Sequence, residues 1–393
     1  LLASAAMATD QFDPTQAVVH ESETWDRVEL LEDSHPALIQ ETFIPLLEHH
    51  QPEIVAAFGG NAAPPSSQFL LHYAPGWEEA THPVPVLLVH GAGVTADHSW
   101  GPNPVMQPGE GLAARLTRAG RKAIAITFAH PHGDNTLQAE ALADAIARVL
   151  HVTDAEQVDL VAWSKGGMAA RMYLSSAGPS WATDFRRDVR RYVMLGTPNG
   201  GIDVAFAYPN LNYWILEQGS PAPLSWTRCL YYGTWVDKTE QSIYARGGAF
   251  PGQAQMVTRW DDRYGRTRAD GQFDIDTTYD GGQGLVSQSL GIDQAIEEGG
   301  HMIAMLERHG VHRSVDMAIL AGTNAYVVGL VGERRGPSDG LLLAASVLHT
   351  EGLTRAGARV IKKDLRAFNH LQLCYDARAN DWVVEALEHD AED

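Results

Sequence analysis

The hydrophobic pattern alternates between short apolar runs and longer stretches in which apolar residues recur with a helical period. The apolar runs lie at residues 84–89, 122–128, 158–162, 189–195, 315–323 and 358–365. The helical stretches lie at residues 109–119, 137–150, 303–309 and 381–389, with another beginning at 341. Continuous apolar runs are typical of strands buried on both faces, and helices alternate with them. The pattern therefore predicts the α/β class, with a mostly parallel sheet and helices on both faces.

This alternation is interrupted twice, which divides the chain into three parts. Residues 1–67 are predicted to be an N-terminal helical extension, with helices at 34–47 and 52–58. Residues 68–200 and 301–393 form the predicted core, and residues 68–73 its edge strand. Residues 201–300 are rich in Tyr, Trp, Gly and Pro without a strand-helix rhythm, and we expect a cap or lid over the sheet edge.

Charge narrows the choice of partners. The 393 residues contain 29 Lys and Arg against 49 Asp and Glu, a net charge of −20 with neutral His. Such a surface repels nucleic acid and anionic membranes, so neither is an expected partner. No apolar run is long enough to span a bilayer, so no stable membrane insertion is expected. Oligomeric state is left open.

The compartment stays open as well. Residues 1–7, Leu-Leu-Ala-Ser-Ala-Ala-Met, fit either an added sequence before a native Met7 or the end of a processed signal. Cys229 and Cys374 are the only cysteines, too few for a disulfide scaffold but enough for one bridge. The cytoplasm is slightly favoured over secretion.

The candidate nucleophile is Ser164. The apolar run 158–162 ends in Trp163-Ser164-Lys165-Gly166-Gly167, and an Ala- and Met-rich helical pattern follows at once. A serine on such a strand-to-helix turn projects its hydroxyl above the sheet, beside the free N–H groups of a helix. A chance turn of small residues is the competing interpretation.

A serine hydroxyl needs a base, and the base needs a carboxylate that orients it. Asp339 lies in a loop after the strand at 315–323, and His370 in the loop after the last strand. Both loops meet the sheet edge that carries Ser164, where ligands bind in open α/β sheets. Rival candidates rank lower: the acids Asp261, Asp262 and Asp280 inside the insertion, and the histidines His301, His309 and His312. These histidines lack the spacing of a standard metal site, so no metal ligand is assigned, but a zinc or calcium site in the insertion stays open.

Acyl transfer places negative charge on a carbonyl oxygen, which two backbone N–H groups can stabilise. Lys165, directly after the serine, offers one. The loop His90-Gly91-Ala92-Gly93 offers the other, from Ala92. The same glycines resemble the start of a phosphate-binding loop, but Ala96 stands at the third glycine position, so nucleotide binding is not expected.

Together these segments resemble the α/β-hydrolase superfamily, and within it the bacterial lipases and esterases. The segments are His90-Gly91, the Ser164 turn, Gly196-Thr197-Pro198, Ser338-Asp339-Gly340 and Asn369-His370. The resemblance covers residues 68–390 without the insertion. It implies an α/β-hydrolase fold, a catalytic triad of Ser164, Asp339 and His370, and an oxyanion hole formed by Ala92 and Lys165.

Two features depart from the family. Trp163-Ser164-Lys165 replaces the more usual His-Ser-Met or His-Ser-Gln, and the N-terminal extension is additional. The insertion also holds many aromatic residues, which can line a cleft or form a core of their own. We take Trp163, Trp214 and Trp235 as the candidate substrate contacts.

The expected function is therefore a serine hydrolase for carboxylic esters, of the lipase or esterase type, with lipophilic substrates and no cofactor. A polyester depolymerase or an acyltransferase would use the same residues, since exclusion of water favours transfer over hydrolysis. A lyase is a weaker possibility. A catalytically inactive binding protein on the same fold is the alternative of another class, because fold does not fix function.

Overall fold

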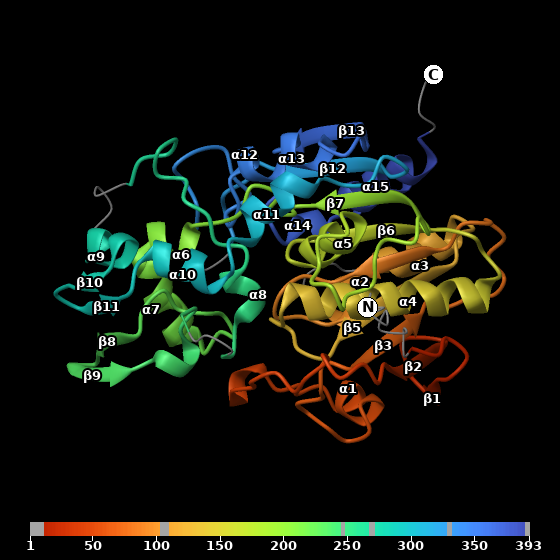
Figure 1. Ribbon diagram of the computed structural model, residues 1–393, viewed down its shortest axis with the longest axis horizontal. Coiled ribbons are helices and arrows are strands. Elements are labelled where there is room, and N and C mark those ends of the chain that lie inside the picture. The colour runs from red at the N-terminus through yellow and green to blue at the C-terminus, as the bar shows by residue number, and fades with distance from the viewer. Residues whose placement is uncertain (1–11, 103–109, 245–247, 267–271, 328–331, 390–393) are drawn as a thin grey trace, which may run out of the picture.

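The computed structural model describes residues 12–102, 110–244, 248–266, 272–327 and 332–389. In this part of the chain a nine-stranded sheet forms the centre, in the order β1-β2-β3-β5-β4-β6-β7-β12-β13 (Figure 1). Its strands are β1 (Val18–His20), β2 (Arg27–Glu32), β3 (Gln68–Tyr73), β4 (Val86–Val89), β5 (Ala123–Phe128), β6 (Val158–Trp163), β7 (Val189–Leu195), β12 (Asp316–Gly322) and β13 (Arg359–Arg366). From β5 to β13 neighbouring strands are parallel, whereas β1, β2, β3 and β5 pair antiparallel.

Helices cover both faces of this sheet, and a separate apolar core lies on each. One core includes side chains of α4 (Asn135–Thr153), α5 (Gly166–Leu174), α11 (Met302–His309), α12 (Ala344–Val347) and α13 (Glu351–Thr354). The other includes α1 (Pro52–Ala57), α2 (Ala96–Trp100), α3 (Leu112–Arg118), α14 (Gln372–Tyr375) and α15 (Ala377–Glu388). Because both faces are covered, every residue of β4, β5 and β6 is buried. The predicted α/β class and mostly parallel sheet are confirmed.

The N-terminal part differs from the expected pattern of helices. No α-helix forms over 34–47, where only the 3-10 turn η1 (Pro45–Leu47) appears, whereas the helix expected at 52–58 is α1. A distant segment binds the backbone here instead, since the amide of Ser66 donates to the carbonyl of Ile39 (3.1 Å). Residues 1–11 of the predicted extension lie outside the described residues.

Strand β2 also changes the position of β3. Residues 68–73 were expected at the sheet edge, but β3 lies inside the sheet, between β2 and β5. Glu29 in β2 is fully buried, where Arg148 of α4 donates to both its oxygens (2.8 and 2.9 Å) and the Tyr73 hydroxyl donates at 2.6 Å. Buried charge is tolerated when it is paired in this way. The strand could not be recognised locally because its partners lie far away in sequence.

The described residues between 201 and 300, which we call the cap, extend away from the main sheet, on the left of Figure 1. The described elements of the cap are α6 (Val204–Ala207), α7 (Pro209–Gln218), β8 (Arg228–Tyr231), β9 (Thr234–Asp237), η2 (Thr239–Gln241), α8 (Pro251–Ala254), α9 (Ile275–Asp280), β10 (Gly282–Gln283), β11 (Ser287–Ser289) and α10 (Ile292–Glu298). The strands form a small sheet in the order β10-β11-β8-β9. Phe206, Tyr208, Tyr244 and Tyr279 belong to the cap's own core, so many of its aromatic residues stabilise the cap itself.

Cys229 in β8 and Cys374 in α14 are both buried and free, so the single bridge that the sequence left open does not form. Among the described helices, none combines the length and the apolar character needed to cross a membrane.

Candidate active site

Ser164 occupies a sharp turn between β6 and α5. Strand β6 ends at Trp163 and helix α5 begins at Gly166, which leaves two residues to reverse the chain. Ser164 has φ = 55°, a left-handed conformation that is costly for a residue with a side chain. Its amide donates to the carbonyl of Leu195 in β7 (2.9 Å), which holds the turn against the sheet. The strained turn leaves the hydroxyl projecting from the carboxyl end of β6.

Gly166 and Gly167 lie where there is no space for a side chain. A Cβ atom on Gly166 would lie 2.2 Å from the carbonyl oxygen of His90, and one on Gly167 would lie 2.2 Å from Oγ1 of Thr197. Both distances are shorter than the van der Waals contact distance, so a side chain at either position would clash. The loops after β4 and β7 therefore approach α5 as closely as glycine permits.

His370 faces Ser164 from the loop after β13. Its Nε2 lies 2.9 Å from the Ser164 hydroxyl oxygen, and its Nδ1 lies 2.8 Å from Oδ2 of Asp339. The imidazole is 4% exposed and the Asp339 carboxylate is fully buried, whereas Ser164 keeps partial exposure. These two hydrogen bonds place a base beside a hydroxyl and a carboxylate behind the base.

Asp339 is held in one orientation by the backbone. Its Oδ1 accepts hydrogen bonds from the amides of Leu341 (3.0 Å) and Leu342 (2.8 Å), and its carbonyl accepts one from the amide of His370 (2.8 Å). Oδ2 is thus left to the imidazole. The amides of Leu341 and Leu342 therefore determine which carboxylate oxygen of Asp339 contacts His370.

Trp163 and Gly196 pack around the imidazole. The Trp163 indole N–H donates to the backbone carbonyl of His370 (3.1 Å), and the two rings lie 5.5 Å apart between centroids. Gly196 has φ = 56°, and a Cβ there would lie 3.3 Å from both His370 Nδ1 and Asp339 Oδ2. Gly196 therefore combines a left-handed backbone with a close approach to the His–Asp pair. Trp163 acts here on the loop of His370, and its side chain is buried.

The His90 side chain orients the Ala92 amide. The amide of Phe128 donates to His90 Nε2 (3.1 Å), so Nδ1 carries the ring proton and donates to the carbonyl of Gly91 (2.7 Å). Burial lowers the pKa of His90 to about 3, which keeps the ring neutral. The Gly91 carbonyl and the Ala92 N–H point in opposite directions in one planar peptide unit, so fixing one fixes the other.

The amides of Ala92 and Lys165 are available to a ligand. Within the described residues, neither N–H has a hydrogen-bond acceptor. Lys165 is also the N-cap of α5, where free N–H groups and the helix dipole favour negative charge. This arrangement can stabilise a carbonyl oxygen that becomes negative beside the Ser164 hydroxyl.

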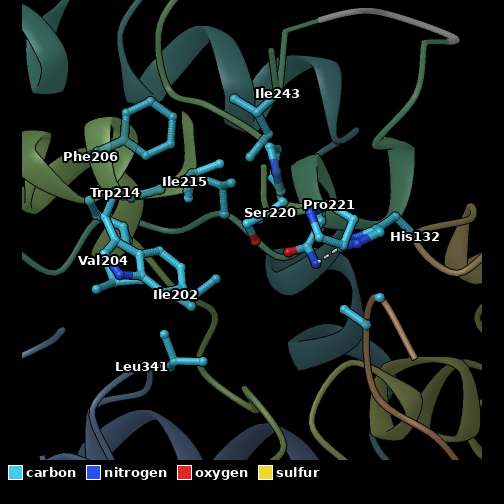
Figure 2. A pocket seen from close by; sticks show the side chains of 18 of the residues that line it. His132, Ile202, Val204, Phe206, Trp214, Ile215, Ser220, Pro221, Ile243 and Leu341 are labelled. Carbon is cyan, nitrogen blue, oxygen red and sulfur yellow. Dashed lines mark hydrogen bonds between the residues drawn. The ribbon is translucent and has the colours of Figure 1, made fainter. Parts of the chain in front are cut away.

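A cavity of about 450 Å³ lies between the core and the cap. Ala92, Leu341 and Leu371 line it on the core side, next to the residues just described. Figure 2 shows the lining of the cavity, in which apolar side chains surround the space. The labelled apolar lining residues are Ile202, Val204, Phe206, Trp214, Ile215, Pro221, Ile243 and Leu341. The cavity suits an apolar group attached to a carbonyl at Ser164.

The other sequence candidates lie elsewhere. Trp214 lines the cavity, but Trp235 of β9 is not among its lining residues and instead stacks with Arg228. Asp261 and Asp280 in the cap pair with Arg259.

The described residues contain one group of three side chains close enough to share a metal ion, Asp33, Glu140 and Asp144, with ligand atoms within 4.8 Å of one another. These residues lie outside the cap, where the sequence left a zinc or calcium site open. Glu140 accepts from the amide and hydroxyl of Thr183 (2.8 and 2.7 Å), so protein donors already serve it.

Sequence reasoning missed the surroundings of the Lys165 side chain. Gln138 of α4, Glu41 of the N-terminal part and Gly252 of the cap all approach it. Three segments far apart in sequence meet there, and no local pattern marks any of them. The one feature of the sequence that could have indicated this environment was the lysine itself, because it directly precedes a glycine and a buried helix.

The order of the functional groups identifies the fold. The Ser164 turn follows β6, Asp339 follows β12 and His370 follows β13, in the chain order Ser, Asp, His. The free amide of Ala92 comes from the loop after another parallel strand, β4. This chain has the α/β-hydrolase fold.

Comparison with known proteins gives the following findings. A family model described as "Domain of unknown function (DUF7379)" matches residues 64–215, and no curated protein matches the chain in sequence. Among solved structures, the Bacillus licheniformis lipase BlEst2 in its propeptide form is 15% identical with a TM-score of 0.47, covering 80% of this chain and 53% of that one. A lipase from Sulfolobus solfataricus, described as putative, is 10% identical with a TM-score of 0.41, covering 95% and 99%. A thermostable carboxyl esterase from Bacillus coagulans is 12% identical with a TM-score of 0.40, covering 95% and 96%.

Proposed function

We propose that this protein is a serine hydrolase that cleaves carboxylic esters with an apolar acyl group through an acyl-enzyme on Ser164. The observation that carries the proposal is the continuous hydrogen-bonded series Ser164–His370–Asp339. It lies beside two unoccupied backbone donors and next to an apolar cavity, whose lining includes Ala92 and Leu371, the residue after His370. Each of these features alone occurs in proteins of other kinds, but together they provide nucleophile, base, oxyanion donors and substrate space.

The proposed reaction gives each of these groups a step. His370 Nε2 takes the hydroxyl proton as Ser164 Oγ bonds to the ester carbonyl carbon, and the carbonyl oxygen becomes negative. The amides of Ala92 and Lys165 donate to that oxygen, and Asp339 stabilises the imidazolium. The imidazolium then protonates the leaving alkoxide, which departs as the alcohol. Water, deprotonated by the same imidazole, releases the acid and restores Ser164.

A fluorophosphonate probe tests the nucleophile. We expect covalent labelling of the folded wild-type protein at Ser164, identified by peptide mapping, and none of the Ser164→Ala variant or of the heat-denatured protein. Failure of the folded wild type to react would contradict the proposal and favour a binding protein on this fold. The substrate class is tested by p-nitrophenyl esters of increasing chain length, with a polyester film, an amide and an added alcohol acceptor alongside.

The cavity predicts a specific change in acyl-chain preference. Ile215→Phe adds volume at a buried position on the cavity wall, so long acyl chains lose space. We expect kcat/KM for the longest accepted p-nitrophenyl ester to fall by about tenfold or more, with little change for the acetate. Trp235→Phe, on a strand away from the cavity, is the matched control. Equal losses for short and long esters would contradict the acyl-binding role of the cavity.

A further inference from the structure

Lys165, whose amide is one of the two proposed oxyanion donors, has a buried side chain. It is 1% exposed although it carries an amine, and its Nζ donates to Oε1 of Gln138. The cap reaches this side chain at Gly252, where a Cβ atom would lie 2.3 Å from Cε and 2.7 Å from Nζ. The site therefore encloses the amine between α4 and α8, with room for no side chain at position 252.

Two acidic residues act on this amine. Glu41 and Asp134 both favour its charged form through space, while its hydrogen-bond partner is a neutral amide. Glu41 itself is held by the amide of Asp134, which donates to Oε1 at 2.8 Å. The other titratable groups that feel the charge of Lys165 are His90, His130 and His132. Burial lowers the pKa of His90 to about 3 and of His130 to about 4, so these rings stay neutral.

We propose that the Lys165 ammonium is a positioning residue whose buried positive charge stabilises the oxyanion of the reaction, and that Glu41 keeps it charged. The inference rests on the proposed function, because it concerns the same serine. The charge of Lys165 reaches His90, whose ring holds the peptide unit of the other proposed oxyanion donor, Ala92. The ammonium therefore lies close enough to this loop for its field to act on a negative oxygen bound there. A buried charge is poorly screened, and at an effective dielectric constant of about 20 the expected contribution to the rate is about tenfold to a hundredfold.

This role gives activity a characteristic pH dependence. Burial lowers the pKa of Lys165 to about 7, and Glu41 and Asp134 act against that shift. Burial raises the pKa of Glu41 to about 7 as well, so the two groups titrate together. The ammonium is the active form. Glu41 ionises over the same range and keeps the amine charged to a higher pH than burial alone would allow, so the contribution of the ammonium is complete below this range and is lost as the pH rises beyond it. His130, His132 and His90 do not change charge over this interval.

The test compares Lys165→Met with wild type from about pH 5.5 to about pH 9. The readouts are the rate of fluorophosphonate labelling and kcat/KM for p-nitrophenyl butyrate. We expect the Lys165→Met variant to be slower by about tenfold to a hundredfold at low pH, with the two curves converging at high pH. Lys122→Met is the matched control, because that lysine lies on the surface over Trp77 and should leave the profile unchanged.

The variant Glu41→Gln provides an independent test in which Lys165 is unchanged. Loss of the carboxylate lowers the pKa of Lys165 further, so the falling limb should move to lower pH. Thermal unfolding of each variant verifies that it is folded. A constant ratio of rates at every pH, or an unmoved limb in Glu41→Gln, overturns the proposed role of the Lys165 charge. Absence of labelling in wild type is a different result, because it contradicts the proposed function itself and the inference with it.

Discussion

Asp339→Asn is expected to lower kcat by about 10⁴ while the protein stays folded. In the structure Oδ1 of Asp339 accepts two backbone hydrogen bonds, from Leu341 and Leu342. The asparagine must keep its oxygen on that side, so its NH₂ group faces His370 Nδ1. The imidazole then has to accept at Nδ1 and carry its proton on Nε2, which faces the Ser164 hydroxyl. A protonated Nε2 cannot take the serine proton.

The measurement is kcat for p-nitrophenyl butyrate together with the rate of fluorophosphonate labelling. Asp316→Asn is the matched control, because Asp316 pairs with Arg359 on the exposed side of the parallel strands β12 and β13. We expect that control to retain wild-type rates. Activity of Asp339→Asn close to that of wild type would show that another carboxylate orients His370.

Arg335→Met should lower the free energy of unfolding by about 3 to 5 kcal/mol. Arg335 is almost fully buried and donates to Asp203 of the cap and to Glu333 near the Asp339 loop. The variant leaves two buried carboxylates without their cation. Such a loss is severe because an unpaired buried charge keeps its desolvation cost without compensation.

Chemical denaturation, monitored by tryptophan fluorescence, measures this change. Arg359→Met removes an arginine whose pair with Asp316 is exposed, and should cost at most about 1 kcal/mol. We expect activity to fall together with stability in Arg335→Met. The reason is that the backbone carbonyl of Glu333 accepts a hydrogen bond from the hydroxyl of Ser338, which precedes Asp339. Equal effects of the two substitutions would contradict the role of Arg335 in joining cap and core.

The core of the fold and the meeting of three side chains could be predicted because each is marked locally. Strands buried on both faces are continuous apolar runs, and Ser164, Asp339 and His370 each follow one of them. The chain order then assigns them to one sheet edge. Gly166 and Gly196 could likewise be noticed, although only the structure shows what each approaches.

The rest depends on partners distant in sequence. Strand β2 contains Glu29, whose burial is possible only because Arg148 arrives from α4. Helix 34–47 was predicted from periodicity, but tertiary hydrogen bonds such as Ser66 to Ile39 override local preference. The choice of Trp235 as a substrate contact rested on composition, which cannot tell which aromatic side chains face a cavity and which build the cap.

The contacts at Gly252 and Asp203 have a consequence for engineering. Both residues belong to the cap, and each contacts a buried cation of the core, Lys165 or Arg335. In a chimaera that receives a cap from another protein of this fold, any residue other than glycine at position 252 would clash with Lys165, and loss of Asp203 would deprive Arg335 of a carboxylate. The cap is therefore not an exchangeable module, and a graft would need to bring a glycine and an aspartate in these two places.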